Sequence, residues 1–224
     1  MSSVVRLDTF VDPQFGENGY VVSVADGGPC WLVDPGFAPA GPRMAEHVKK
    51  KGLQPQALIL THGHLDHIVG VPDIVKAFPD VPVWVSEEAA VALADPEENL
   101  SAQYGFPIVV KVGQTHDLPA GGTLKLGGTD WRVFDTSGHA PGSRSLYCAA
   151  AGLVIVGDAL FYRSIGRTDF HHSRHAQLIR NIREHLLTLP DETQVYSGHG
   201  PVTTVGAERR MNPFIQAGAE EMMD

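Results

Sequence analysis

The sequence has little that would point to secretion or to a membrane. It contains only two cysteines, Cys30 and Cys148, both within apolar segments, which indicates reduced, buried thiols rather than a disulfide framework. No stretch approaches the ~20 apolar residues of a membrane span. The N-terminus, MSSVVRLDTF, has no basic region followed by an apolar one, so we expect no signal peptide. We therefore predict a cytoplasmic protein with no membrane partner.

Positive charge is also scarce. Lys and Arg total 17 against 26 Asp and Glu, which gives a formal net charge of −9. Non-specific binding to nucleic acid needs clustered cations that neutralise phosphates. The one dense basic segment, VKKKG (48–52), falls at the end of an expected helix, where cations interact favourably with the helix dipole. We therefore predict no nucleic-acid partner.

The 224 residues are 43% hydrophobic, and we expect one domain over residues 1–224. Strands are predicted where apolar runs are bounded by Gly and Pro, at 4–10, 19–25, 30–36, 57–60, 81–85, 107–112, 123–128, 131–136, 145–150, 153–158 and 194–198. Helices are predicted at about 42–51, 72–78, 87–94 and 175–187. Many consecutive strands have no helix between them. This pattern favours an α/β protein with two helix-covered sheets over a single doubly wound sheet.

Side chains of the metal-ligand type follow four of these strands. THGHLDH (61–67) comes directly after the apolar run ALIL (57–60), and three later strands each lead into one more such residue. An isolated histidine is usually a surface or hydrogen-bonded residue, but strand ends are where sites assemble in α/β proteins. The joint pattern indicates a metal site made by His62, His64, Asp66, His67, His139, Asp158 and His199.

The number of donors indicates two ions. A catalytic zinc takes three protein ligands, so five imidazoles and two carboxylates are too many for one ion. Alternate residues of an extended segment face the same way, which directs His62 and His64 to the same ion. We predict that the ligands divide into His62, His64 and His139 on the first ion and Asp66, His67 and His199 on the second, with Asp158 bridging.

The donors are nitrogen and oxygen alone, which suits zinc, iron and manganese. We expect two divalent ions, with zinc first among the candidates. Such a pair lowers the pKa of a shared water towards ~7 and generates a hydroxide nucleophile at neutral pH. Asp66 is the expected catalytic residue, because it would orient that hydroxide as well as bind metal.

These motifs also carry a family resemblance. THGHLDH resembles the T-H-x-H-x-D-H motif of the metallo-β-lactamase superfamily, and SGH (137–139), GD (157–158) and GHG (198–200) match its later motifs in order. The resemblance covers essentially the whole chain. It implies an αββα four-layer sandwich with a dinuclear site at one edge, and it supports the ligand assignment. VDPG (33–36) resembles another element of the family, in which we expect Asp34 to be structural and to order the loops of the site.

Further segments narrow the resemblance to a branch. Asp158 stands where the β-lactamase branch has Cys, which argues against that activity. GDALFYRSIGRTDF (157–170) resembles both glyoxalase II-like hydrolases and persulfide dioxygenases. GHGPVTTVGAERRMNPF (198–214) resembles the glyoxalase II-like side, of the shorter bacterial type without a helical C-terminal domain. The resemblance implies a hydroxyacylglutathione (thioester) hydrolase with a small-molecule substrate. The alternatives are a mononuclear-iron persulfide dioxygenase and another hydrolase of the superfamily, such as a lactonase.

Four residues are candidates for substrate contacts. Arg167 matches a basic, glutathione-contacting position in the family's G-[KR] motif, but Asp169 replaces the tyrosine expected two positions on. Arg167 is therefore expected either to pair with a substrate carboxylate or to form a salt bridge with Asp169. Phe161, Tyr162 and Arg163 are predicted to form part of the pocket wall. His171 and His172 follow in the same loop region, and the sequence assigns them no role.

Overall fold

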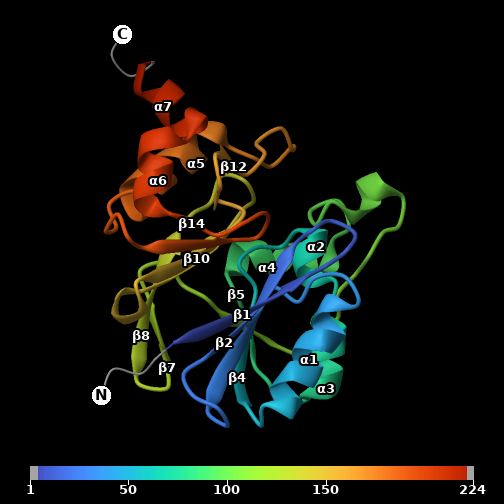
Figure 1. The fold of residues 1–224 in the computed structure, drawn as a ribbon. Helices are drawn as coiled ribbons and strands as arrows, with labels where there is room; N and C mark the ends of the chain where they lie inside the picture. Colours follow the sequence, from blue (N-terminus) through green and yellow to red (C-terminus); the bar gives the residue numbers. More distant parts are fainter. Residues whose placement is uncertain (1–4, 221–224) are drawn as a thin grey trace.

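The computed structural model describes residues 5–220, which form two six-stranded sheets packed face to face between helices (Figure 1). The first sheet has the order β1-β2-β3-β4-β5-β6. Its strands are β1 (Arg6–Val11), β2 (Asn18–Ser23), β3 (Pro29–Val33), β4 (Gln54–Ile59), β5 (Val83–Val85) and β6 (Thr115–Asp117). The first three are antiparallel, and β3 to β6 run parallel to one another.

Helices fill the connections between the parallel strands of the first sheet, as right-handed crossovers require. They are α1 (Ala40–Lys50), α2 (Leu65–Ile68), α3 (Val71–Ala77), α4 (Glu87–Ala94) and a 3-10 helix (Ser101–Tyr104). Apolar side chains of α1, α3 and α4, such as Met44, Ile74 and Leu93, pack with Val21, Leu32 and Leu58 on the outer face of the sheet. No helix within residues 5–220 is long and apolar enough to cross a membrane.

The second sheet has the order β14-β13-β10-β9-β8-β7 and is antiparallel except for the pair β10–β13. Its strands are β7 (Thr123–Leu126), β8 (Thr129–Asp135), β9 (Arg144–Cys148), β10 (Leu153–Gly157), β13 (Gln194–Ser197) and β14 (Thr203–Thr204), and β11 (Leu160–Phe161) and β12 (Ser164–Ile165) form a separate hairpin. The remaining elements are a 3-10 turn (Ala149–Ala151), α5 (His175–Asn181), a π-helical turn (Ile182–Leu186), α6 (Val205–Met211) and α7 (Pro213–Glu220).

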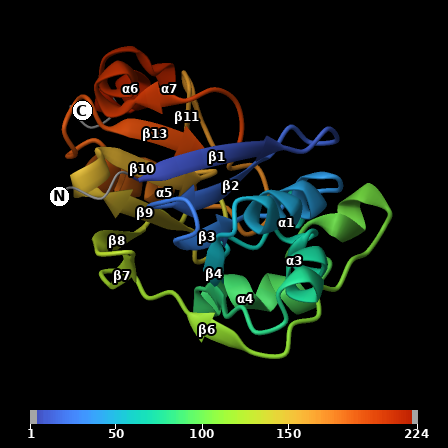
Figure 2. The ribbon, with the colours of Figure 1, turned by 60° about the horizontal axis from the view of Figure 1, so that its bottom comes forward.

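Alternation along the strands produces the layers. On β3, Leu32 faces the helices of the first sheet, whereas Trp31 and Val33 face the second sheet. On β10, Val154 packs under α5 and α6, whereas Ile155 faces the first sheet. The interface between the sheets is therefore an apolar layer, in which the rings of Trp31 and Trp131 lie 5.3 Å apart. Figure 2 shows the two sheets side by side, with α1, α3 and α4 on one flank and α6 and α7 on the other. The predicted αββα sandwich is confirmed.

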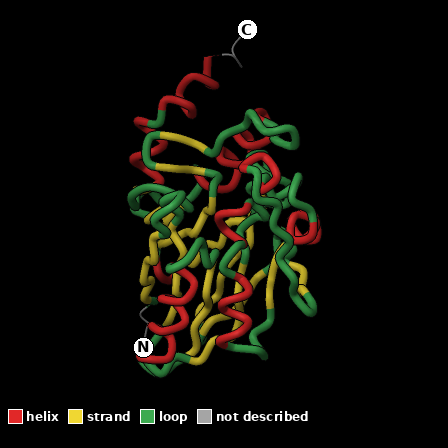
Figure 3. The backbone as a smooth tube through the Cα atoms, turned by 90° about the vertical axis from the view of Figure 1, so that its right-hand side faces the viewer, coloured by secondary structure: helices red, strands yellow, loops and turns green. Residues whose placement is uncertain are grey.

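Most predicted elements are present within a few residues of their expected limits, but the predicted strand at 107–112 is wrong. Its backbone groups are bonded elsewhere: Val110 N donates to Leu93 O at the end of α4, and Ile108 N donates to the hydroxyl of Ser101. The edge strand β6 forms later, at Thr115–Asp117. The predicted helix at 175–187 is also divided, into α5 and the π-helical turn. Figure 3 shows loops gathered at one end of the strands, and this end carries the site.

Candidate metal centre

The seven predicted ligands come from four separate segments and meet at one end of the two sheets. His62 follows β4, and His64 is the N-cap of α2, whose single turn carries Asp66 and His67. His139, Asp158 and His199 lie just beyond β8, β10 and β13. The structure therefore brings together residues of both sheets that are far apart in the sequence.

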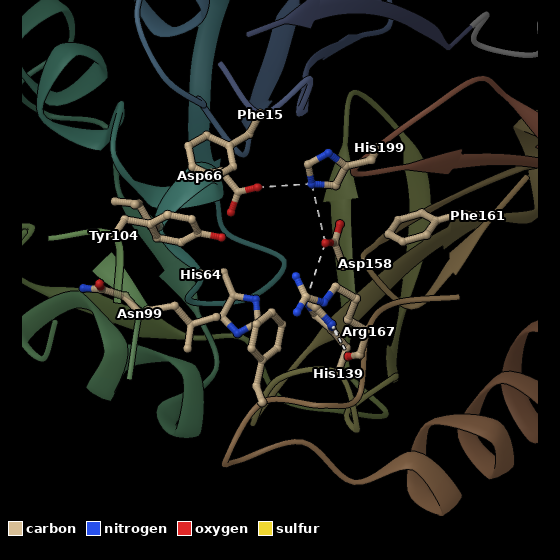
Figure 4. A pocket seen from close by; sticks show the side chains of 13 residues that line it. Phe15, His64, Asp66, Asn99, Tyr104, His139, Asp158, Phe161, Arg167 and His199 are labelled. Carbon is tan, nitrogen blue, oxygen red and sulfur yellow. Dashed lines mark hydrogen bonds and ion pairs between the residues drawn. The ribbon is translucent and has the colours of Figure 1, made fainter. Parts of the chain in front are cut away.

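Six of the predicted ligands lie in two groups of three, with Asp158 between them. Candidate ligand atoms of His62, His64 and His139 lie within 4.8 Å of one another, and so do those of Asp66, His67 and His199. Asp158 lies between the triads: its Oδ1 is 3.3 Å from His67 Nε2, and its Oδ2 is 3.5 Å from the Nε2 atoms of both His139 and His199 (Figure 4). One carboxylate is thus within reach of both groups of histidines.

Buried atoms without partners indicate that this site is built for metal. His62 Nε2, His67 Nε2, His139 Nε2 and Asp158 Oδ1 are buried and have no hydrogen-bond partner. Buried polar atoms in folded proteins are almost always hydrogen-bonded, so four orphans in one place need an explanation. In each of the three imidazoles the opposite nitrogen is engaged: Nδ1 of His62 with Thr61 Oγ1 (3.1 Å), of His67 with Asp34 Oδ2 (2.9 Å), and of His139 with Arg167 O (2.8 Å).

These hydrogen bonds fix the tautomers. A neutral imidazole that donates from Nδ1 presents a lone pair at Nε2, which is the form that ligates a divalent ion. His64 has the reverse arrangement, because its Nε2 is 3.0 Å from Nε2 of His172 and its Nδ1 is the nitrogen left for an ion. The donor set and its orientation therefore fit divalent metal ions.

Electrostatics divides the histidines in the same way. Burial, reinforced by neighbouring imidazoles, lowers the pKa of His62 and His64 well below its usual value, and burial also lowers the pKa of His139. Burial opposes protonation of His67 too, but the carboxylates of Asp158 and Asp66 outweigh it and raise the pKa of that imidazole. The first triad is thus neutral, and the second is rich in negative charge that favours a cation.

Close packing at Gly198, just after β13, allows His199 to lie next to Asp158 and His67. A Cβ at position 198 would overlap Asp158 Oδ1 and would lie 2.6 Å from His67 Cε1. Any larger residue would displace the carboxylate that joins the two triads. The glycine in the sequence GHG is therefore required by the site itself.

The loops around the metal centre enclose a cavity of about 260 Å³. Figure 4 shows the rings of Phe15, Tyr104 and Phe161 around the candidate ligands that line this cavity, which are His64, Asp66, His139, Asp158 and His199. The lining residues are Phe15, His64, Leu65, Asp66, Asn99, Leu100, Tyr104, His139, Asp158, Phe161, Arg167, Phe170 and His199. The rings of Phe15, Tyr104, Phe161 and Phe170 thus belong to the wall of the cavity that contains the candidate ligands.

The predicted substrate contacts are only partly in this cavity. Phe161 and Arg167 line it, and Arg167 forms a bidentate salt bridge with Asp169 (2.9 and 2.8 Å) while its guanidinium lies over the ring of Phe170. Tyr162 and Arg163 do not line it. They form the turn of the β11–β12 hairpin, which is directed toward α6: Arg163 N donates to Glu208 Oε2, and its guanidinium donates to the carbonyl of Ala207.

Several site residues escaped sequence reasoning. Glu17 is fully buried behind His67, with Oε1 3.9 Å from His67 Nδ1, and burial raises the pKa of this carboxyl well above its usual value. Phe15 lies in a turn and Tyr104 ends the 3-10 helix (Ser101–Tyr104), and their rings meet edge to face at 5.3 Å. Turn residues of this kind carry no periodicity that would reveal them. Phe170 could have been found from its place in the loop that holds Arg167.

The protein has relatives of closely similar length. The sequence profile of the Metallo-beta-lactamase superfamily matches residues 13–199. The probable metallo-hydrolase YqgX of Bacillus subtilis is 41% identical over 187 residues, which cover 83% of this chain and 87% of the relative. Hydroxyacylglutathione hydrolase GloC of Haemophilus influenzae is 33% identical over 187 residues, with the same coverage of 83% and 87%.

Solved structures have the same architecture. BLEG-1 B3 metallo-beta-lactamase superposes with a TM-score of 0.87 at 35% identity, over 94% of this chain and 99% of the other. TTHA1623 in a di-iron-bound form gives 0.80 at 32% identity, over 92% and 99%. ETHE1 from Myxococcus xanthus gives 0.72 at 27% identity, over 93% and 83%. With the fold and the clustered histidines and aspartates, these similarities show that the chain belongs to the metallo-beta-lactamase superfamily.

Proposed function

We propose that this protein hydrolyses thioesters, with hydroxyacylglutathiones such as S-D-lactoylglutathione as the substrate class. The proposal rests on one observation: the floor of the cavity of about 260 Å³ is formed by residues of both triads together with Asp158. The relative GloC, named a hydroxyacylglutathione hydrolase, supports the choice of substrate. We further propose two divalent ions as cofactors, with zinc as the first candidate. Iron is the alternative, because the similar TTHA1623 structure is described as di-iron-bound.

The residues of the site fit the steps of thioester hydrolysis. When bound, two divalent ions supply a water of lowered pKa and polarise the substrate carbonyl. Asp66 lies on the cavity floor, with Oδ2 3.1 Å from His199 Nε2, where its carboxylate can orient the attacking oxygen. That oxygen adds to the acyl carbon, the carbon–sulfur bond breaks, and the thiolate leaves with the bonding electrons. A thiol has a pKa of ~8.5, so its departure needs little help from an acid.

The walls of the cavity give the substrate its place. Phe161 flanks the floor on one side, and Phe15 and Tyr104 lie on the opposite side. Phe170 also lines the cavity, so the reacting thioester would be shielded from bulk water. Arg167 supplies a positive charge at the rim. It can pair with a substrate carboxylate if it exchanges its exposed partner Asp169, since both side chains are about two-thirds exposed (66% and 65%).

A persulfide dioxygenase with one iron is the second candidate. The sequence GRTDF (166–170), which resembles that branch of the superfamily, favours it. The complete second triad, in which His199 Nε2 lies 3.1 Å from Asp66 Oδ2, favours the dinuclear hydrolase instead. The two reactions differ in their demand for oxygen, which makes them easy to separate.

The test is hydrolysis of S-D-lactoylglutathione by the purified protein, with elemental analysis of the same sample. We expect turnover and about two metal ions per chain. The matched variants are Asp66→Ala, which should lose activity, and His116→Ala, whose ring stacks on Trp84 away from the site and should leave activity unchanged. Absence of turnover in fully metallated protein would refute the thioesterase proposal. Oxygen uptake with glutathione persulfide, and assays with a lactone and a chromogenic β-lactam, would then distinguish the other chemistries.

A further inference from the structure

A second group of metal-ligand side chains lies beside the first triad, outside the seven-residue set. Glu98 belongs to the turn after α4, and His171 and His172 belong to the loop before α5. Candidate ligand atoms of these three residues lie within 4.8 Å of one another. Glu98 and His171 are open to solvent, with 36% and 50% of their side chains exposed, whereas only 7% of His172 is exposed. The group therefore has one anchored and two accessible donors.

The separations within this group fit a shared ion better than direct hydrogen bonds. His171 Nε2 is 3.3 Å from His172 Nδ1 and 3.5 Å from Glu98 Oε1, and His172 Nδ1 is 3.9 Å from Glu98 Oε2. Both distances to the carboxylate exceed the 2.7–3.2 Å range typical of hydrogen bonds. Ligands bound at ~2.0–2.1 Å around a tetrahedral ion lie about 3.3–3.4 Å from one another. If Glu98 binds through both of its oxygens, the donors need to close by about half an ångström at most to surround one ion.

We propose that Glu98, His171 and His172 form a third, outer metal site, which takes a divalent ion of the zinc class. Two imidazoles and one carboxylate are a donor set that suits such ions, with the fourth position open to water at the protein surface. The proposal concerns binding alone, so it does not depend on which reaction the inner centre catalyses.

The outer site is coupled to the inner one through a single hydrogen bond. Nε2 of His172 is 3.0 Å from Nε2 of His64. When His64 ligates an inner ion through Nδ1, its Nε2 carries the proton and donates to His172, which places the His172 proton on Nδ1. The outer ion needs that same Nδ1, so His172 must change tautomer and lose the hydrogen bond. Such coupling is reciprocal, and the outer ion is expected to bind more weakly than the inner ions and to weaken ligation by His64.

The test is a calorimetric titration of the metal-loaded, desalted holoprotein with Zn²⁺, without substrate. We expect one further ion per chain, bound more weakly than the resident ions. His171→Ala and Glu98→Gln should each weaken it by at least ~10-fold, while elemental analysis shows the resident ions unchanged. His175→Ala is the matched control, because this histidine lies in the same segment but bonds to Thr168 Oγ1 (3.0 Å). Absence of a further ion in the wild type, or its persistence in both variants, would overturn the outer site.

Discussion

Asp34 lies directly behind His67, with its Oδ2 2.9 Å from His67 Nδ1 and both side chains buried. The same carboxylate accepts hydrogen bonds from the backbone N–H and the hydroxyl of Thr61, at 2.8 and 2.6 Å. Thr61 in turn meets Nδ1 of His62. One carboxylate beyond the direct ligands thus orients a histidine of each triad.

Asp34→Ala should therefore weaken metal binding although Asp34 is not a predicted ligand. Loss of the partner behind a ligating histidine typically costs ~10–100-fold in metal affinity. We expect a decrease of that size for the ion held by His67, measured by competition with a chromogenic chelator. Asp26→Ala is the control, because Asp26 pairs with Arg6 on the surface. An unchanged affinity in Asp34→Ala would show that His67 needs no orienting partner.

Asp158→Ala tests the bridge between the triads. The carboxylate lies 3.3–3.5 Å from Nε2 atoms of His67, His139 and His199, and these imidazoles outweigh burial to lower its pKa, so it is ionised. Its removal leaves two clusters of histidines without the shared negative charge. We expect loss of one ion per chain by elemental analysis and a fall in turnover of at least ~100-fold. Near-normal metal content and rate would rule out the bridging role.

The sequence was sufficient for the parts of the molecule that repeat a simple rule. Strands such as β10, LVIVG, are continuous apolar runs, and the predicted ligands lie in the segments that follow strand ends, so the strands and the candidate ligands could be located together. The motif THGHLDH also indicated two groups of candidate ligands. The backbone is extended at His64, and the turn of α2 that follows carries Asp66 and His67. Asp34 was predicted to order the loops, and its bonds to Thr61 and His67 do so.

The parts that failed depend on contacts between distant segments. PIVVKV (107–112) has the composition of a strand, but its backbone is bonded to the end of α4 and to Ser101. The sequence around Glu17 is typical of a turn. Glu17 belongs to the site only because its segment forms a β-bridge with His199. Arg163 has the chemistry of a substrate ligand but is held by Glu208, 45 residues away. Composition cannot reveal which partner such a residue meets.

The ion pair between Arg167 and Asp169 is expected to influence the affinity for a substrate that carries a carboxylate. An exposed ion pair contributes little to stability, because solvent screens the attraction, so neither residue should matter for folding. Arg167→Ala should raise KM several-fold for a thioester that carries a carboxylate and leave kcat nearly unchanged. Asp169→Ala should lower KM, because it releases the guanidinium for the substrate. Steady-state kinetics on both variants provides the check, and equal effects on an uncharged thioester would exclude a charge contact.

Glu17 gives the protein a dependence of stability on pH. Its side chain is fully buried, both of its carboxyl oxygens lack hydrogen-bond partners, and burial raises its pKa well above the usual 4.5. An acid whose pKa is raised by folding binds a proton more tightly in the native than in the unfolded state. The contribution of Glu17 to the free energy of unfolding is therefore most favourable below pH 4.5. It is lost progressively as the pH rises toward the pKa of Glu17 in the native state.

Glu17→Gln removes this charge with little change of shape. We expect the variant to melt at least ~2 °C above the wild type at about pH 8, and the gain to shrink as the pH falls toward about 5. Thermal unfolding should be followed in protein stripped of metal, because bound ions add their own dependence on pH. Glu97→Gln, at an exposed position, is the control and should show no such trend. A gain of equal size at both pH values would mean that the introduced amide acts through packing, and that Glu17 is not held protonated by its burial behind His67.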